Sequence, residues 1–189
     1  MLTDNSVNQL KSTFRGEVIL PGDASYDVAR KVFNGMIDRH PGIIVKCADV
    51  TDVINAVNFG RDNNLLIAVR SGGHSAGGLG VCDDGLVIDL SKIKYTHIDS
   101  DAETVLVGCG CTWGDVDHAT NGFGFVTPSG MVSTTGVSGL TLGGGMGHLT
   151  RKFGLTIDNL LEADVVLANG KLVKANKDLN QDLFWAIRG

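Results

Sequence analysis

The chain has 189 residues, of which 43% are hydrophobic and 20% charged, and its formal net charge is −5 at pH 7. A chain of this length and composition can bury a substantial core and fits one domain or two small lobes. The acidic balance and the lack of a Lys/Arg cluster disfavour nucleic acid as a partner, because phosphate recognition rests on a basic patch.

The sequence shows no targeting or membrane segment. The start at 1–5 lacks the basic and apolar regions of a signal peptide, and no apolar run approaches the ~18 residues that span a membrane. We therefore expect a cytoplasmic protein with no membrane partner.

Alternating strand and helix patterns predict a small βαβ lobe over residues 1–81. A strand at 43–47 leads into a helix that we expect Thr51 to cap, and a second strand follows at 66–70. The expected inward face of the helix carries Val53, Ile54 and Val57.

A larger, mixed α+β lobe is predicted over residues 82–189. Thr112, with Asp115 three positions later, is typical of a helix N-terminus. Asn169-Gly170 between two apolar runs predicts a hairpin. Strands are expected at 86–90, 95–99, 104–108, 163–167 and 172–174.

The segment Arg70-Ser71-Gly72-Gly73-His74-Ser75 follows the strand expected at 66–70. Gly72 and Gly73 can take positive φ and let N–H groups converge, and such a concavity binds phosphate oxygens. Arg70 adds positive charge. Because a phosphate cradle has no need of His74, the combination favours a ligand with a pyrophosphate and a second, reactive part. The alternative is a glycine-rich turn with a surface histidine.

A second glycine-rich segment lies between Gly130 and Gly147, and 18 of the 26 glycines lie between Gly72 and Gly147. So many glycines oppose a rigid helical scaffold and suit backbone packed around a flat or anionic ligand. Neither G-x-G-x-x-G nor G-x-x-x-x-G-K-[ST] occurs. Hydroxyl donors within the segment are Ser133, Thr134, Thr135 and Ser138.

The cysteines and tryptophans are interpreted as core residues. No C-x-x-C occurs, so we expect small buried thiols in a reducing compartment and no metal site. Trp113 and Trp185 both sit in amphipathic helix patterns, where core packing is commoner than stacking on a ligand. The four cysteines are Cys47, Cys82, Cys109 and Cys111.

In their order and spacing, these segments resemble the FAD-linked oxidases related to berberine bridge enzyme, within the vanillyl-alcohol oxidase and p-cresol methylhydroxylase superfamily. The resemblance covers 41–189 and corresponds to the N-terminal FAD-binding part of that family. The motifs that carry it include Arg70–Ser75, Thr112-Trp113-Gly114-Asp115-Val116, Thr127-Pro128-Ser129-Gly130, the second glycine-rich segment and Asp182-Leu183-Phe184-Trp185-Ala186-Ile187-Arg188-Gly189.

The resemblance implies an FAD-binding domain with two α/β lobes and the flavin between them. It implies that His74 is the covalent attachment point for the flavin 8α-methyl group. Many members carry a second tether, a cysteine on the flavin C6, where this chain has Val132, so a single tether is expected. The implied cofactor-binding residues are Arg70, Ser71, Gly72, Gly73, His74, Ser75, Gly130, Thr134, Thr135, Gly136, Ser138, Gly139, Gly144, Gly145, Gly147, Asn159 and Val165.

For function, the resemblance implies hydride transfer from an alcohol, sugar or amine to flavin N5. Related reductases of cell-wall precursor synthesis bind FAD without a tether, and His74 argues against that alternative. Family members continue past the last motif into a substrate domain, so we expect a truncated chain that lacks this domain and contains no catalytic base. The second hypothesis is a catalytically silent flavin-binding or interaction module, with exposed apolar surface that favours self-association.

Overall fold

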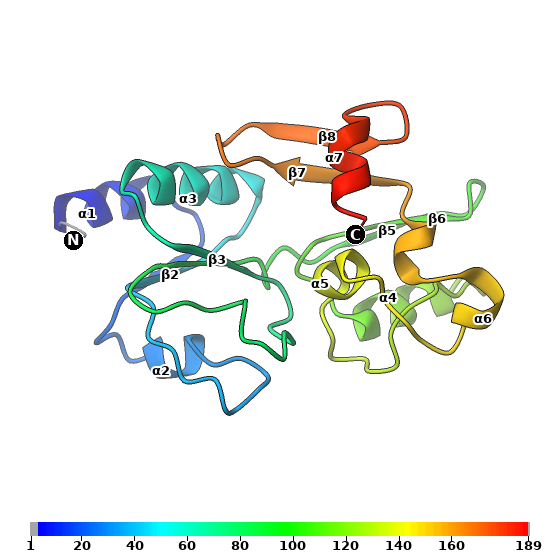
Figure 1. Cartoon of the computed structure of the whole chain (residues 1–189), viewed down its shortest axis with the longest axis horizontal. Helices are drawn as coiled ribbons and strands as arrows, with labels where there is room; N and C mark the ends of the chain where they lie inside the picture. Colours follow the sequence, from blue (N-terminus) through cyan, green and yellow to red (C-terminus); the bar gives the residue numbers. More distant parts are fainter. Residues whose placement is uncertain (1–3, 189) are drawn as a thin grey trace. The chain divides into compact units, whose positions relative to one another are not determined.

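The structure is a computed structural model that describes residues 4–188 (Figure 1). The chain divides into two compact units, one formed by residues 1–92 and 166–172 and the other by 93–165 and 173–189. The expected absence of a targeting segment at 1–5 lies largely outside the described residues, and so does Gly189 of the last motif.

The first unit is built on a four-stranded sheet with the strand order β1-β2-β4-β3. Strands β2, β4 and β3 are parallel, and β1 pairs with β2 antiparallel. The elements of this unit are α1 (Asp4–Thr13), β1 (Glu17–Ile19), α2 (Tyr26–Ala29), β2 (Ile43–Lys46), α3 (Val50–Asp62), β3 (Ile67–Arg70) and β4 (Leu86–Asp89).

Both faces of this sheet are covered, with α1 and α3 on one side and α2 on the other (Figure 1). Central parallel strands buried on both faces consist of continuous apolar runs. Accordingly Ile44 and Val87 are fully buried and pack against Tyr26 and Ala29 of α2. The Tyr26 hydroxyl donates to the Pro41 carbonyl at 2.8 Å, which satisfies a buried polar group.

The first unit extends further than the sequence predicts. We expected the small lobe to end at residue 81, yet β4 lies beyond that point and pairs with both β2 and β3. A central strand cannot be separated from its two neighbours, so the first unit continues to residue 92. The residues 166–172 also group with this unit.

Helix α3 begins at a different cap from the one predicted. The Asp49 side chain accepts hydrogen bonds from the backbone N–H groups of Thr51 and Asp52, which places Thr51 inside the helix. An aspartate is as good a cap as a threonine, and here it lies two residues earlier. The fully buried positions are Asp52, Ala56 and Gly60, whereas the expected inward face at Val53, Ile54 and Val57 is only half-buried.

The second unit contains the antiparallel pair β5–β6, most of the pair β7–β8 and several short helices. The hairpin predicted at Asn169-Gly170 is confirmed: β7 pairs with β8, and Gly170 has a φ of 80°. The elements of this unit are β5 (Thr96–Asp99), β6 (Thr104–Val107), α4 (Trp113–Asn121), α5 (Val137–Leu142), α6 (Thr150–Phe153), the 3₁₀ helix η1 (Thr156–Asn159), β7 (Glu162–Val166), β8 (Leu172–Asn176) and α7 (Gln181–Ala186). The predicted α+β class is confirmed.

Helix α5 lies inside the second glycine-rich segment, whose glycine content disfavours a helix. Its Val137 and Leu140 pack against a small core of Cys111, Trp113 and Val116. Most helical stability in proteins comes from such tertiary packing, which here outweighs the poor helix propensity of glycine.

The two tryptophans have opposite environments. Trp113 is 2% exposed and belongs to the core of the second unit, as predicted. Trp185 is 76% exposed, so the prediction of a core role for it was wrong. Helix α7 turns the neighbouring Phe184 inward instead, with 7% exposure.

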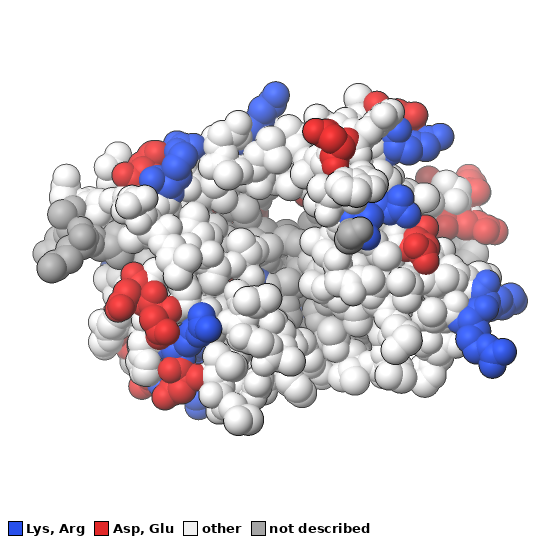
Figure 2. Space-filling model, in the orientation of Figure 1, with Lys and Arg blue, Asp and Glu red and all other residues white. Residues whose placement is uncertain are grey.

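Within residues 4–188, no helix is both long enough and apolar enough to cross a membrane. On the face drawn in Figure 2, Lys and Arg side chains lie next to Asp and Glu side chains around the edge. Ion pairs at the surface of the described residues include Arg15–Asp49 and Arg61–Asp62.

Candidate cofactor site

The first glycine-rich loop leaves the sheet at the carboxyl end of the parallel strand β3. Gly73 has a φ of 69°, in the left-handed region, whereas Gly72 is not among the residues with positive φ. Further along, the Ser75 carbonyl accepts from the Gly78 N–H at 3.1 Å, and the Ser75 hydroxyl oxygen accepts from Leu79 N–H at 3.2 Å. Ligands of parallel sheets bind outside the carboxyl ends of the strands, which is where this loop lies.

Arg70 does not serve the loop as a free cation. Its guanidinium is 6% exposed and donates to the Asp89 carboxylate from Nη2 at 2.7 Å and from Nε at 3.2 Å. Nη2 also donates to the Ala29 carbonyl at 2.6 Å, and Nη1 to the Lys31 carbonyl at 3.3 Å. Because Asp89 neutralises this charge and holds two of the donors, Arg70 has a structural role here, and its contact with a cofactor stays a prediction.

His74 is half-buried and lies against an aromatic side chain. The ring centroids of Phe33 and His74 are 4.2 Å apart and the ring planes differ by 14°. Phe33 comes from the segment between α2 and β2, and the sequence offered no signal for this contact because the two residues are far apart in the chain. The His74 imidazole is therefore held in a defined plane at the end of the loop.

Two glycines of the second segment are required by close packing within the protein. A Cβ on Gly147 would lie 1.8 Å from the Ser129 carbonyl oxygen. Gly145 has a φ of 76°, and a Cβ there would lie 2.4 Å from the Thr156 hydroxyl. Thr156 N–H in turn donates to the Gly145 carbonyl at 2.9 Å. These two positions need glycine whether or not a ligand is present.

Gly144 and Gly130 have more room for a side chain, although the positive φ of Gly144 still favours glycine. Gly144 has a φ of 101° and only a Leu155 methyl 3.7 Å from its Cβ position. At Gly130 the nearest atom to an added Cβ is a Leu140 methyl, at 2.3 Å. Because that methyl is the end of a flexible side chain, it can move aside more easily than backbone.

The segment 134–139 presents its backbone more openly. Thr134 and Gly139 are exposed, and nothing lies within 4 Å of a Cβ added at Gly139. The Ser138 hydroxyl donates to the Cys109 carbonyl at 3.0 Å, and the Thr135 carbonyl accepts from the Trp113 N–H at 3.0 Å. These two hydrogen bonds hold the segment against Cys109 and Trp113, while Thr134 and Gly139 stay exposed.

The buried Gly136 forms the N-terminal boundary of α5, and an isolated antiparallel bridge joins it to Thr112. Of the remaining predicted residues, Asn159 donates from Nδ2 to the carbonyls of Phe153 at 3.0 Å and Leu155 at 2.9 Å. Its amide group therefore shapes the turn between α6 and η1. Val165 is half-buried in β7.

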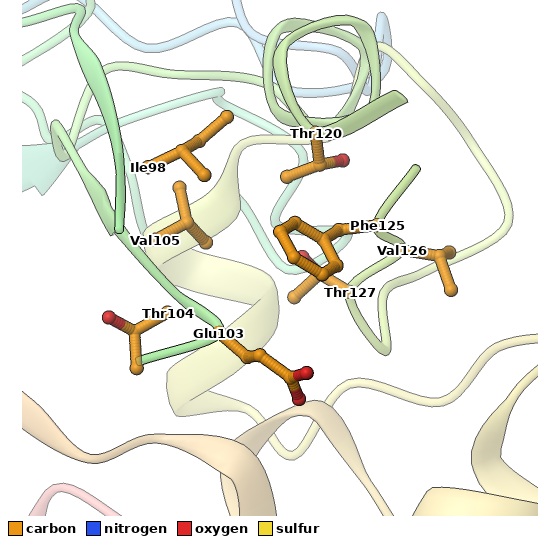
Figure 3. Close-up of a pocket in the computed structure, with 8 residues that line it drawn as sticks. All are labelled: Ile98, Glu103, Thr104, Val105, Thr120, Phe125, Val126 and Thr127. Atoms are coloured by element: carbon orange, nitrogen blue, oxygen red, sulfur yellow. The ribbon is translucent and has the colours of Figure 1, made fainter. Parts of the chain in front are cut away.

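Two pockets of the second unit contain none of the predicted site residues. The first has a volume of about 140 Å³, and Figure 3 shows Ile98 and Val105 facing the Phe125 ring across it. Cofactor pockets are usually several hundred Å³, so this pocket is too small for a nucleotide. The second measures about 490 Å³ and is open, and its charged residues Lys94 and Asp115 bond to each other at 2.8 Å.

The four cysteines are thiols that form no disulfide within the described residues, and burial raises the pKa of Cys82, Cys111 and Cys109, the last to about 11. A thiol with a raised pKa is a poor nucleophile at neutral pH. In the described part of the chain, no three His, Cys, Asp or Glu side chains are grouped closely enough to hold a metal ion.

Comparison with known proteins assigns the family. A family model described as an FAD binding domain matches residues 41–176, a span that includes both glycine-rich segments. An FAD-linked oxidoreductase of Dictyostelium discoideum is 41% identical over 184 residues, which cover 97% of this chain and 40% of the relative. The chain belongs to the FAD-binding domain family of FAD-linked oxidoreductases. The resemblance seen in the sequence is thereby confirmed.

Solved structures agree with this assignment. The chain superposes on 6-hydroxy-D-nicotine oxidase from Arthrobacter nicotinovorans with a TM-score of 0.91 and 38% identity, over 93% of this chain and 39% of that one. The glucooligosaccharide oxidase from Acremonium strictum gives a TM-score of 0.91 and 31% identity, over 98% and 39%. The chain thus spans about 40% of the length of the relatives that it matches.

Proposed function

We propose that this FAD-binding domain holds FAD through the loop 71–75 and the segment 134–139, and that the whole protein is an FAD-dependent oxidoreductase. The observation that carries the proposal is the position of His74. It follows the left-handed Gly73 in a glycine-rich loop at the carboxyl end of β3, inside the span matched by the FAD-binding model.

The residues present are compatible with a nucleotide. The left-handed Gly73 turns the backbone in a conformation that a residue with a side chain adopts only with strain. Gly139 leaves open space above exposed backbone, and a flat ring system needs such space to approach closely. The hydroxyl and N–H groups around them supply donors for phosphate oxygens.

Bound FAD would supply the redox chemistry, accepting a hydride from the substrate at flavin N5. The tasks of this chain are to bind and orient the cofactor. We propose that the substrate is a small molecule with an oxidisable alcohol, sugar or amine carbon. Support comes from two relatives, a nicotine oxidase and a glucooligosaccharide oxidase, which act on substrates of these kinds.

His74 is proposed as the only covalent tether to the flavin. The glucooligosaccharide oxidase that matches this chain carries a flavin joined to both a histidine and a cysteine. Val132, at the position where the resemblance puts the cysteine, has no thiol and cannot form the second bond. A covalent substituent on the flavin ring alters its electronics, so the attachment tunes the reduction potential as well as retaining the cofactor.

A second candidate is a catalytically silent flavin-binding module. The observation that favours it is the coverage, since the chain spans about 40% of its relatives. Orientation of substrate against the flavin and proton transfer together contribute many powers of ten to rate, so FAD binding by itself does not make a protein an active enzyme.

One experiment separates the two candidates. The protein is titrated with FAD and then mixed anaerobically with a panel of alcohols, sugars and amines. Bleaching of the flavin absorbance by any panel compound supports the oxidoreductase. FAD binding without bleaching by any of them favours the silent module. Failure of the protein to bind FAD contradicts the cofactor assignment.

A further inference from the structure

The stacked pair Phe33–His74 has a feature that core packing does not explain. The Phe33 side chain is 70% exposed, yet its ring lies nearly parallel to the imidazole with 4.2 Å between the ring centroids. Single exposed apolar side chains are common on protein surfaces. This one is distinguished by the residue that it covers, because His74 is the proposed flavin attachment point.

The backbone around Phe33 is tied to the same loop on both sides of His74. Phe33 N–H donates to the Gly73 carbonyl at 3.0 Å. The Asn34 amide Nδ2 donates to the Ala76 carbonyl at 2.8 Å. The backbone that carries the Phe33 ring is therefore held beside the loop by hydrogen bonds that do not depend on the Phe33 side chain.

Further hydrogen bonds to the same segment come from a buried side chain. The buried Arg70 side chain, on the strand that leads into the loop, donates to the carbonyls of Ala29 and Lys31. The segment 29–34 is thus hydrogen-bonded to β3 and to the loop at several points. This arrangement forms a rigid support for the Phe33 ring, because each end of the segment has its own partner.

The ring contact restricts the imidazole in a chemically useful way. The lone pair of an imidazole nitrogen lies in the ring plane, so the rotation of that plane decides where the nitrogen can form a bond. An aromatic ring stacked on one face of the imidazole limits this rotation. Reactions of well-oriented groups gain rate because the orientational entropy is lost before the reaction begins.

We propose that Phe33 is a positioning residue for covalent attachment of flavin at His74. Its ring holds the imidazole plane so that a ring nitrogen meets the 8α carbon of the flavin methyl group. This inference rests on the proposed function, in which His74 is the tether.

The attachment step balances with dioxygen as oxidant. A His74 ring nitrogen forms a bond to the 8α carbon, and that bond replaces one C–H bond of the methyl group and the N–H bond of the imidazole. The two hydrogens leave as two protons and two electrons, which reduce dioxygen to hydrogen peroxide.

The test uses full-length apoprotein from a riboflavin-limited culture, mixed with FAD in air. Acid-insoluble flavin is followed over time, and the affinity for non-covalent FAD is measured separately. Phe33→Ala is expected to slow attachment by about 10-fold to 100-fold, as loss of orientation does, with FAD affinity changed by less than about 3-fold. Phe33→Leu keeps apolar bulk without a ring and should stay slow, whereas Phe33→Trp should recover most of the rate.

Met36→Ala is the matched control. Met36 lies in the same connection between α2 and β2 and is 90% exposed, so its truncation removes a similar apolar side chain from the surface. The control is expected to attach flavin at the wild-type rate. If Met36→Ala slows attachment as much as Phe33→Ala does, the effect is a general disturbance of the segment and the proposal is overturned.

A spectroscopic readout is independent of the flavin. Ring current from Phe33 should shift the His74 Cε1 proton upfield in the unliganded protein, and the shift should vanish in Phe33→Ala and Phe33→Leu. Wild-type attachment rates in Phe33→Ala overturn the proposal and leave the tether intact. If the wild-type protein forms no acid-insoluble flavin, the tether itself is refuted and the role of Phe33 falls with it.

Discussion

Arg70 and Asp89 occupy paired positions on the adjacent parallel strands β3 and β4, and the Arg70 Nη2 atom lies 2.7 Å from the Asp89 carboxylate. Each side chain is 6% exposed. Because Arg70 is the last residue of β3, this buried pair fixes the point at which the loop carrying His74 leaves the sheet. The sequence places Arg70 as a positive charge beside a phosphate-binding loop. In the structure, Arg70 is buried against Asp89 and supports that loop from the protein interior.

Removing one partner of this pair should be costly. Arg70→Ala leaves the Asp89 carboxylate buried and unpaired, and we expect the free energy of unfolding to fall by about 3 to 5 kcal/mol. Urea unfolding measures the change. The surface pair Arg15–Asp49, whose Arg15 side chain is 79% exposed, is the control, since Arg15→Ala should cost less than about 1 kcal/mol. Equal losses in the two variants contradict the structural role of Arg70.

Gly73 should matter for FAD more than for folding. A Cβ there meets no protein atom closer than 3.5 Å, so an added methyl costs the fold mainly the strain of the left-handed φ of 69°, about 1 to 2 kcal/mol. Gly73→Ala should nevertheless weaken FAD binding by at least about tenfold by blocking backbone approach. Isothermal titration with FAD checks this. Gly22→Ala, at a φ of 99° with open space around it, is the comparison variant that should keep its affinity.

Two glycines of the second segment should behave in opposite ways. Gly147→Ala places a Cβ 1.8 Å from a backbone oxygen and should destabilise the second unit by about 3 kcal/mol or more. Gly139→Ala adds a methyl to open space in helix α5 and should stabilise the unliganded protein by about 0.5 to 1 kcal/mol. FAD affinity should still fall in Gly139→Ala. Thermal unfolding with and without FAD resolves both effects, and an unchanged affinity in Gly139→Ala argues against contact with FAD at that position.

Cys109 should make stability fall at alkaline pH. Burial raises the pKa of its thiol from 9.0 to about 11, so between these values the folded protein retains a proton that the unfolded chain has released. The stabilising contribution is present below pH 9 and is lost as the pH rises through 11, by up to about 1 kcal/mol per pH unit. Urea unfolding at several pH values, with Cys109→Ala for comparison, isolates this slope. Parallel pH dependences of the two proteins would mean that Cys109 does not contribute.

Patterns within short stretches of sequence predicted much of the fold. The apolar runs of β2 and β4 and the Asn169-Gly170 hairpin follow from local chemistry, which a single stretch of chain contains. The role of Arg70 was not predictable, because its partner Asp89 is 19 residues away and meets it only through the β3–β4 register. The end of the first unit was not predictable either, because β4 joins this unit only through its pairing with the sequence-distant strands β2 and β3.

The candidate site shows the same division. The two glycine-rich segments and His74 were visible in the sequence, whereas the contact between Phe33 and His74 arises from a connection that folds back onto the loop. Helix α5 forms among glycines because Val137 and Leu140 pack against the core of Cys111, Trp113 and Val116, and this tertiary packing outweighs the low helix propensity of glycine. Chemistry-bearing residues are thus easier to find from sequence than the residues that position them.

The central claim is tested most directly by acid precipitation of the full-length protein, followed by peptide mass analysis of any flavin in the pellet. We predict that the wild-type pellet retains flavin on the peptide containing His74 and none on the peptide containing Val132, and that His74→Ala releases all its flavin to the supernatant. Free FAD in the wild-type supernatant, with no flavin in the pellet, would contradict the account.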